Sequence, residues 1–285
     1  MRIDPIGTTF AGEVSGIDIT RPISDAEVAA IEAGMDRHGV LVFHDQALTD
    51  DAQREFSRRF GPLEASGGGH IIQAKERRLP LDMQDASNLD QNQQVFGRDD
   101  RRRMFNLGNR LWHSDSSYRP VTARYSLLSG RIVVDEGGRT EFADMRGAYD
   151  ALDSETKAEI ADLVCEHSLM FSRGALGFTE LTDAEREMFK PVRHLLVRVH
   201  PIAGRKSLFL SAHAGGIVGW PVPEARAFLR DLNEHATQRK FVYSHAWKRN
   251  DLVIWDNRVT MHRVTRFDER QVRDMRRTTV AGIAA

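Results

Sequence analysis

The sequence predicts a mainly β protein, an antiparallel sandwich or jelly roll with flanking helices. Many short runs of alternating polar and apolar residues are separated by turn residues, without regular alternation of strands and helices. No Gly-x-Gly-x-x-Gly fingerprint or P-loop occurs, which argues against the common nucleotide-binding folds. The 285 residues, 41% of them hydrophobic, suffice for one large core. We expect a single domain over residues 1–285.

The first 60 residues predict the order strand, helix, strand, helix. Ser24 and Glu27 have the spacing of a capping box, which opens an amphipathic helix that ends near Gly39. The apolar run Val40–Phe43 predicts a short buried strand. Thr49 is a helix cap, and the second helix is expected to run through Phe60.

The segment from about residue 65 to 105 shows no clear periodicity. A loop of roughly 40 residues is far longer than the usual connection of about 4–6 residues, and such loops are often lids or binding segments. We expect an active-site lid or insertion here. A merely solvated insertion is the alternative.

The remaining chain predicts short strands interrupted by helices, with a last strand from Asp274 to Gly282. The other expected strands are Tyr125–Val134, Thr140–Met145, Leu195–His200, Ser207–Ser211, Phe241–His245 and Leu252–Trp255. The expected helices are Met145–Leu152, Ser154–Leu163, Asp183–Phe189 and Pro223–His235.

The charge balance limits the classes of partner. Forty basic residues against 41 acidic ones give a formal net charge of −1, which argues against a nucleic-acid binder. The single cysteine, Cys165, allows no intramolecular disulfide and suits a reducing cytoplasm. No secretory signal or apolar membrane span is visible. We expect a cytoplasmic homo-oligomer that acts on a small molecule.

Two residues near the middle of the chain, His113 and Asp115, suit a metal site. In an extended chain, residues two apart point to the same side, so both side chains can converge on one ion. Taken alone, such a pair is also compatible with a structural or surface role that involves no metal.

His262 would complete a set of two histidines and one carboxylate. That set leaves coordination positions open and is typical of non-haem Fe(II) oxygenases. Zinc accepts the same ligand types, so a zinc hydrolase and a metal-binding jelly roll without turnover stay open at this point.

The last predicted strand carries arginines that favour the oxygenase. Arg273, Met275 and Arg277 share one face of the strand, and Arg276 points away. Four residues of strand span about 13 Å, so two guanidinium groups can bind two separate anions. An oxygenase with a dicarboxylate co-substrate needs this, whereas a zinc hydrolase does not. Interleaved acidic residues weaken a nucleic-acid interpretation; these are Asp268, Glu269 and Asp274.

Together these motifs resemble the Fe(II)/2-oxoglutarate-dependent dioxygenases of the taurine dioxygenase/2,4-dichlorophenoxyacetate dioxygenase family. The similarity covers nearly the whole chain and includes Gly12–Asp18, Phe56–Pro62, Trp112–Asp115, Gly137–Phe142 and His262–Arg277. The stretches most like the 2,4-dichlorophenoxyacetate branch are His113–Ser117, Ala123–Ser126, Asp144–Leu152 and Glu234–Arg239.

The resemblance implies a double-stranded β-helix, the cupin-like form of the jelly roll, and assigns roles to the motif residues. Fe(II) would be bound by His113, Asp115 and His262, which makes them the catalytic residues. The co-substrate 2-oxoglutarate would be bound by Thr140 and Arg273, with Trp255 lining its pocket, and O2 would be the second co-substrate.

The substrate-binding residues implied by the resemblance are Asn109, Trp112 and Arg277, with Arg277 holding the anionic group. His213, beside two glycines, is a further candidate for substrate contact.

The activity implied is hydroxylation of a small organic anion, for which we expect an aryloxyacetate such as 2,4-dichlorophenoxyacetate. Hydroxylation beside the ether oxygen yields an unstable hemiacetal that releases a phenol and glyoxylate, while 2-oxoglutarate yields succinate and CO2. Taurine, another sulfonate or an alkyl sulfate is the alternative substrate.

Overall fold

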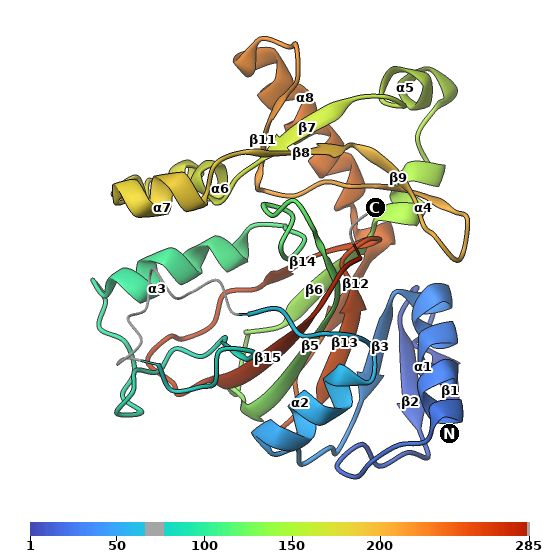
Figure 1. Ribbon diagram of the computed structural model, residues 1–285, viewed down its shortest axis with the longest axis vertical. Helices are drawn as coiled ribbons and strands as arrows, with labels where there is room; N and C mark the ends of the chain where they lie inside the picture. Colours follow the sequence, from blue (N-terminus) through green and yellow to red (C-terminus); the bar gives the residue numbers. More distant parts are fainter. Residues whose placement is uncertain (66–76, 284–285) are drawn as a thin grey trace.

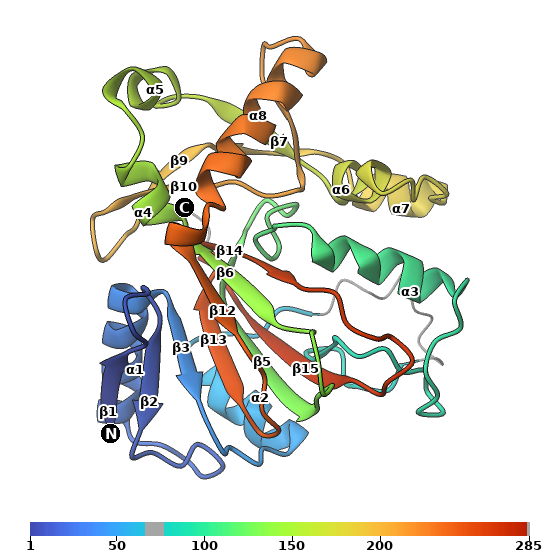
Figure 2. The same cartoon turned by 180° about the vertical axis from the view of Figure 1, so that it is seen from behind.

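The computed structural model describes residues 1–65 and 77–283 and forms a jelly roll from two facing sheets (Figures 1 and 2). The larger sheet has the order β1 (Arg2–Pro5), β2 (Gly12–Ser15), β3 (Val40–Phe43), β13 (Leu252–Asp256), β5 (Ala123–Ile132), β15 (Asp274–Ala281) and β4 (Gln84–Asp85). The smaller has the order β12 (Val242–His245), β6 (Thr140–Asp144) and β14 (Thr260–Val264). The predicted fold class is confirmed.

The two sheets enclose a core of large side chains. Phe142 and Tyr243 come from the smaller sheet, and Val253, Trp255 and Met275 come from the larger. Alternate residues of a strand point to opposite faces of its sheet. In β13, for example, Val253 and Trp255 lie in the cluster between the sheets, and Leu252 and Ile254 lie in another apolar cluster. Apolar side chains from both sheets therefore fill the space between them.

The N-terminal elements follow the predicted caps closely. Helix α1 (Asp25–His38) begins at Ser24, whose side chain accepts a hydrogen bond from the Glu27 backbone, and ends at Gly39 with φ of 72°. Helix α2 (Asp50–Arg58) begins at Thr49 and ends two residues before the predicted end. Two strands, β1 and β2, precede α1 where one was expected.

A second layer of strands and helices covers the upper end of the two sheets, at the top of Figure 1. Its strands are β7 (Val164–His167), β8 (Val192–Leu195), β9 (Val197–Val199), β10 (Lys206–Leu208) and β11 (Ala214–Ile217). Its helices are α4 (Met145–Asp150), α5 (Ser154–Glu159), α6 (Leu169–Ala175), α7 (Asp183–Met188) and α8 (Val222–Ala236). Ala143 of β6 and Met261 of β14 share one apolar cluster with Leu196 and Leu232, so this layer is continuous with the jelly roll.

The segment predicted to be a long loop contains ordered elements. Its residues 66–76 lie outside the described residues. The rest includes β4 and helix α3 (Arg101–Asn106), which Asp100 caps. The 3-10 helix η3 (Leu107–Arg110) follows directly after this segment. The expected long loop is wrong for this part, because helix α3 has no apolar periodicity and so gives no pattern in the sequence. The active-site lid or insertion stays a prediction. No helix in the described ranges is long and apolar enough to cross a membrane.

Candidate active site

The structure brings the three predicted metal ligands together. His113 follows η3 and pairs with His262 of β14 through two backbone hydrogen bonds, 3.0 Å from His113 N to His262 O and 2.8 Å in return. Asp115 follows two residues later. One ligand atom from each residue lies within 4.8 Å of the other two. Nε2 of His262 lies 3.7 Å from Oδ2 of Asp115.

The electrostatics of these three side chains suit a divalent cation. Burial lowers the pKa of both His113 and His262, so both imidazoles are neutral at pH 7. Burial alone would raise the pKa of Asp115, but the neighbouring guanidinium of Arg277 is the main group that lowers it, to about 2. His113 donates from Nδ1 to the Leu111 carbonyl at 2.8 Å, which leaves its Nε2 lone pair for a metal. The donor set fits iron(II) in charge and in type.

A polar network fixes the position of Asp115. Its Oδ2 accepts a hydrogen bond from Ser126 Oγ at 2.8 Å, and its backbone nitrogen donates to Asn257 Oδ1 at 3.1 Å. Asn257 in turn donates to Ser126 at 3.0 Å and accepts from Trp255 Nε1 at 3.0 Å. These hydrogen bonds hold the carboxylate in place, as groups that hydrogen-bond to a metal ligand commonly do. No role was predicted from the sequence for Asn257 or Ser126.

The predicted 2-oxoglutarate residues line a cavity of about 110 Å³ beside the ligands, called here the first cavity. Thr140, Trp255 and Arg273 all line it together with His113 and His262. Arg273 is buried, which lowers its pKa to about 10, so it stays charged at neutral pH. Trp247, for which no role was predicted from the sequence, donates from Nε1 to Thr140 Oγ1 at 2.9 Å.

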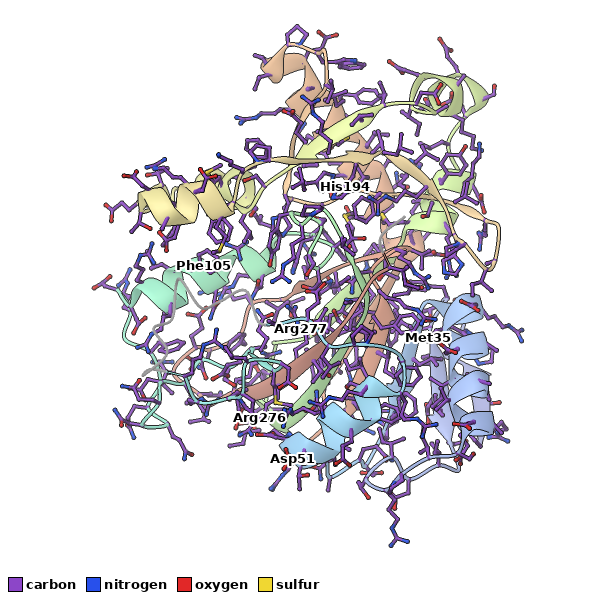
Figure 3. The ribbon with its side chains drawn as sticks, viewed as in Figure 1. Met35, Asp51, Phe105, His194, Arg276 and Arg277 are labelled. Atoms are coloured by element: carbon purple, nitrogen blue, oxygen red, sulfur yellow. The ribbon has the colours of Figure 1, made fainter. Side chains whose placement is uncertain are left out.

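A second cavity also borders the candidate metal ligands. It is lined by Gln84, Phe105, Asn109, His113, Asp115, Tyr118, Leu169, Arg173, Phe189, His213 and Arg277. Arg277 lines both cavities and donates from Nη1 to Asp115 Oδ1 at 2.6 Å and from Nη2 to Gln84 Oε1. Figure 3 places Arg277 at the centre of the molecule and Arg276 beside α2, as the alternation along the strand predicts. Arg276 contacts Asp50 of α2.

The other predicted substrate residues divide into two groups. Asn109 lines both cavities, and His213 lines the second, where its Nδ1 is 2.9 Å from Ser172 Oγ. Trp112 lines neither cavity among the described residues. It packs in the apolar cluster of the second layer, under the guanidinium of Arg263. Because adjacent residues of an extended chain point to opposite sides, the neighbour of a metal ligand faces away from the metal.

The jelly roll and the buried ligand set define the class of non-haem iron dioxygenases that use 2-oxoglutarate and O2. The family model described as "Taurine catabolism dioxygenase TauD, TfdA family" matches residues 2–279, and the chain belongs to this family. The chain is therefore a 2-oxoglutarate-dependent dioxygenase, an enzyme rather than a metal-binding protein without turnover.

The chain is similar to several known proteins over nearly their whole length. The 2,4-dichlorophenoxyacetate dioxygenase of Cupriavidus pinatubonensis is 45% identical, over 97% of this chain and 96% of that protein. The (S)-phenoxypropionate/α-ketoglutarate dioxygenase of Delftia acidovorans is 35% identical, over 99% and 95%. The crystal structure of AAD-2 in complex with Mn(II) and N-oxalylglycine is 58% identical, with a TM-score of 0.97 and coverage of 99% and 98%.

Proposed function

We propose that this dioxygenase hydroxylates an aryloxyacetate such as 2,4-dichlorophenoxyacetate at the carbon beside the ether oxygen. The product breaks down to a phenol and glyoxylate, and 2-oxoglutarate is converted to succinate and CO2. Iron, when bound, supplies the activation of O2 that this chemistry needs. The protein's own residues bind and orient the two organic anions.

The proposed roles follow from where the side chains lie. His113, Asp115 and His262 hold the iron. Arg273 and Thr140 bind the far carboxylate of 2-oxoglutarate, beside Trp255, because the buried guanidinium and hydroxyl face the first cavity. Arg277 binds the substrate's anionic group, and Asn109 and His213 line the substrate's path.

The lining of the second cavity is the observation that carries the substrate class. Phe105, Leu169 and Phe189 form an apolar wall, and Arg277 provides a cation beside the metal ligands. An aryl ring joined to a carboxylate through an ether oxygen and one carbon needs both features at once. We assign the wall to these residues rather than to Trp112, which lies in the core. The names of the relatives at 45% and 35% identity support this substrate class.

An assay with Fe(II), 2-oxoglutarate and O2 tests the proposal. Succinate release is measured with 2,4-dichlorophenoxyacetate, a phenoxypropionate, taurine and an alkyl sulfate at equal concentration. We expect the aryloxyacetate to be consumed fastest, with a phenol as product, because taurine leaves the apolar wall solvated. Faster turnover of taurine or of the alkyl sulfate, without phenol, would assign the enzyme to the alternative substrates.

We also propose a cytoplasmic homo-oligomer without a nucleic-acid partner. The balanced charge supports the lack of such a partner, and the free, buried Cys165 suits a reducing compartment. Leu195, Val199 and Ile202 are exposed aliphatic side chains on or near β8 and β9, which supports contact between subunits there. Light scattering of the purified protein measures the oligomeric state.

A further inference from the structure

Arg173, on α6, is a buried cation for which the described residues provide no carboxylate. The residue is 5% exposed. Within the described part of the chain, its hydrogen bond runs from Nη1 to Ser172 Oγ at 3.1 Å, and its buried Nε has no acceptor. Burial lowers its pKa to about 10, so the side chain remains positive at neutral pH. A buried charge left without a counter-ion is costly, so an anion at this place would be stabilised.

The guanidinium of Arg173 is held in a fixed position by the segment before the metal ligands. Its Cζ lies 4.3 Å from the ring centroid of Phe105 on α3. Gly108 of η3 packs directly against it: a Cβ at this glycine would lie 2.3 Å from both Cζ and Nη1. A side chain at position 108 would therefore displace the guanidinium, and glycine leaves the space that it occupies.

Arg173 lines the second cavity together with Asp115 and Arg277. Asp115 is the one carboxylate among the described residues of that lining, and it is already bonded to Arg277. Nη1 and Nη2 of Arg277 are bonded to Asp115 and Gln84, and its Nε has no acceptor among the described residues. The cavity thus has two guanidinium groups with unused donors and one carboxylate. This surplus of positive charge suits an anionic occupant.

We propose that Arg173 is a substrate-binding residue that, with Arg277, binds the carboxylate of the aryloxyacetate. The inference rests on the proposed function and extends it by adding a second cation from a different element of the fold. The ring of the substrate packs against Phe105 and Phe189, which line the same cavity. Arg173 thereby makes the enzyme select for the ionised acid over neutral analogues of the same shape.

The test replaces Arg173 by methionine in the iron-loaded enzyme. We expect the KM for 2,4-dichlorophenoxyacetate to rise roughly 10- to 150-fold, as loss of a charge-assisted contact predicts. The KM for 2-oxoglutarate should stay within about twofold, because Arg273 and Thr140 lie outside the lining of the second cavity. The affinity for the neutral amide, 2,4-dichlorophenoxyacetamide, measured as inhibition, should not change. Arg173→Lys should restore part of the affinity for the acid.

Arg198→Met is the matched control. Arg198 is also an arginine whose pKa burial lowers to about 10, and its Cζ lies 3.6 Å from the ring centroid of Phe209, but it does not line the second cavity. This variant should keep all three constants. Gly108→Ala is an independent variant that retains the charge and displaces the guanidinium, and it should weaken binding of the acid selectively as well. If Arg173→Met does not fold, Gly108→Ala carries the test.

Equal loss of affinity for the acid and the amide, or an equal rise in the KM for 2-oxoglutarate, would overturn the inference. Arg173 would then only hold α3 and η3 in place. If the wild-type enzyme consumes no aryloxyacetate, the proposed function has failed. The same variants are then assayed with the anion that the wild type does consume and with its neutral analogue. A selective loss for that anion upholds the role of Arg173, and an unselective one refutes it.

Discussion

At the scale of single residues, the proposed metal ligands His113 and Asp115 are positioned by hydrogen bonds to Leu111, Ser126 and Asn257. We expect His113→Ala, Asp115→Ala and His262→Ala each to abolish turnover and to lose most of the iron affinity. The fold should survive, because these side chains add little to the apolar clusters of the core. Iron content and circular dichroism are measured on the same samples. A variant with wild-type iron content and turnover would show that its residue is not a ligand.

Arg273, directly before β15, and Arg277, within it, should bind different molecules. Arg273→Ala should raise the KM for 2-oxoglutarate, since Arg273 lines only the first of the two cavities. Arg277→Ala should raise the KM for the organic substrate, by roughly 10- to 150-fold for a lost charge-assisted contact. Steady-state kinetics with each compound varied in turn separates the two constants. Equal shifts of both constants in both variants would contradict the assignment.

His167, on β7, predicts a pH dependence of stability away from the active site. It is fully buried, neither ring nitrogen has a partner among the described residues, and burial lowers its pKa from 6.5 to about 3. Below pH 6.5 the unfolded chain therefore binds a proton that the folded chain does not. The stability present above pH 6.5 is lost as the pH falls toward 3, by about 2 kcal/mol at pH 5.

The variant His167→Phe removes this proton and both unsatisfied nitrogens while keeping a ring beside Phe209. Urea unfolding is measured for both proteins at pH 7.5 and pH 5. We expect the variant to lose about 2 kcal/mol less than the wild type between the two pH values. Parallel losses in the two proteins would show that His167 is protonated in the folded state.

At the scale of elements, one glutamine joins helix α2 to the larger sheet. Gln53 is fully buried and donates from Nε2 to the carbonyls of Leu127 on β5, at 3.1 Å, and Arg276 on β15, at 3.0 Å. Its Oε1 accepts from Ser129 Oγ at 2.7 Å. Gln53→Ala leaves these buried groups unsatisfied and should cost about 3 kcal/mol in the free energy of unfolding.

Chemical denaturation measures this loss, and Glu55→Ala is the control. Glu55 is exposed on the same helix, so its replacement should change stability by less than about 0.5 kcal/mol. Comparable losses in the two variants would mean that the bonds of Gln53 contribute nothing beyond helix propensity.

The elements differ in how far the sequence alone predicts them. Helix α1 was predicted almost to the residue, because Ser24, Glu27 and Gly39 set its ends through local hydrogen bonds and backbone conformation. Helix α3 was not predicted, since Arg101–Asn106 has no buried face and depends on its cap at Asp100 and on contacts from other elements. Strand β11 was also missed, because the Gly215–Gly216 pair gives no strand pattern and pairs with β7 only in the folded chain.

At the scale of the whole molecule, the single domain expected from the sequence predicts one cooperative unit, and the apolar cluster that joins the second layer to the jelly roll supports this prediction. Trp220 packs against the cluster of the second layer, and Trp255 lies in the cluster between the two sheets. We expect urea unfolding followed by tryptophan fluorescence and by far-ultraviolet circular dichroism to give one coincident transition. Two separated transitions would show that the second layer unfolds independently of the jelly roll.

The sequence by itself predicted the fold class and the family, and through the family resemblance it proposed the metal ligands and the 2-oxoglutarate residues, because the motifs that carry this resemblance are short stretches of residue types at characteristic spacings. Only the tertiary structure decided what surrounds them. The side chain of Trp112 points into the apolar core. Phe105, Arg173 and Phe189 come from separate segments and meet at the second cavity. Contacts between segments far apart in the chain fix that lining, and no local pattern records which side chains will meet.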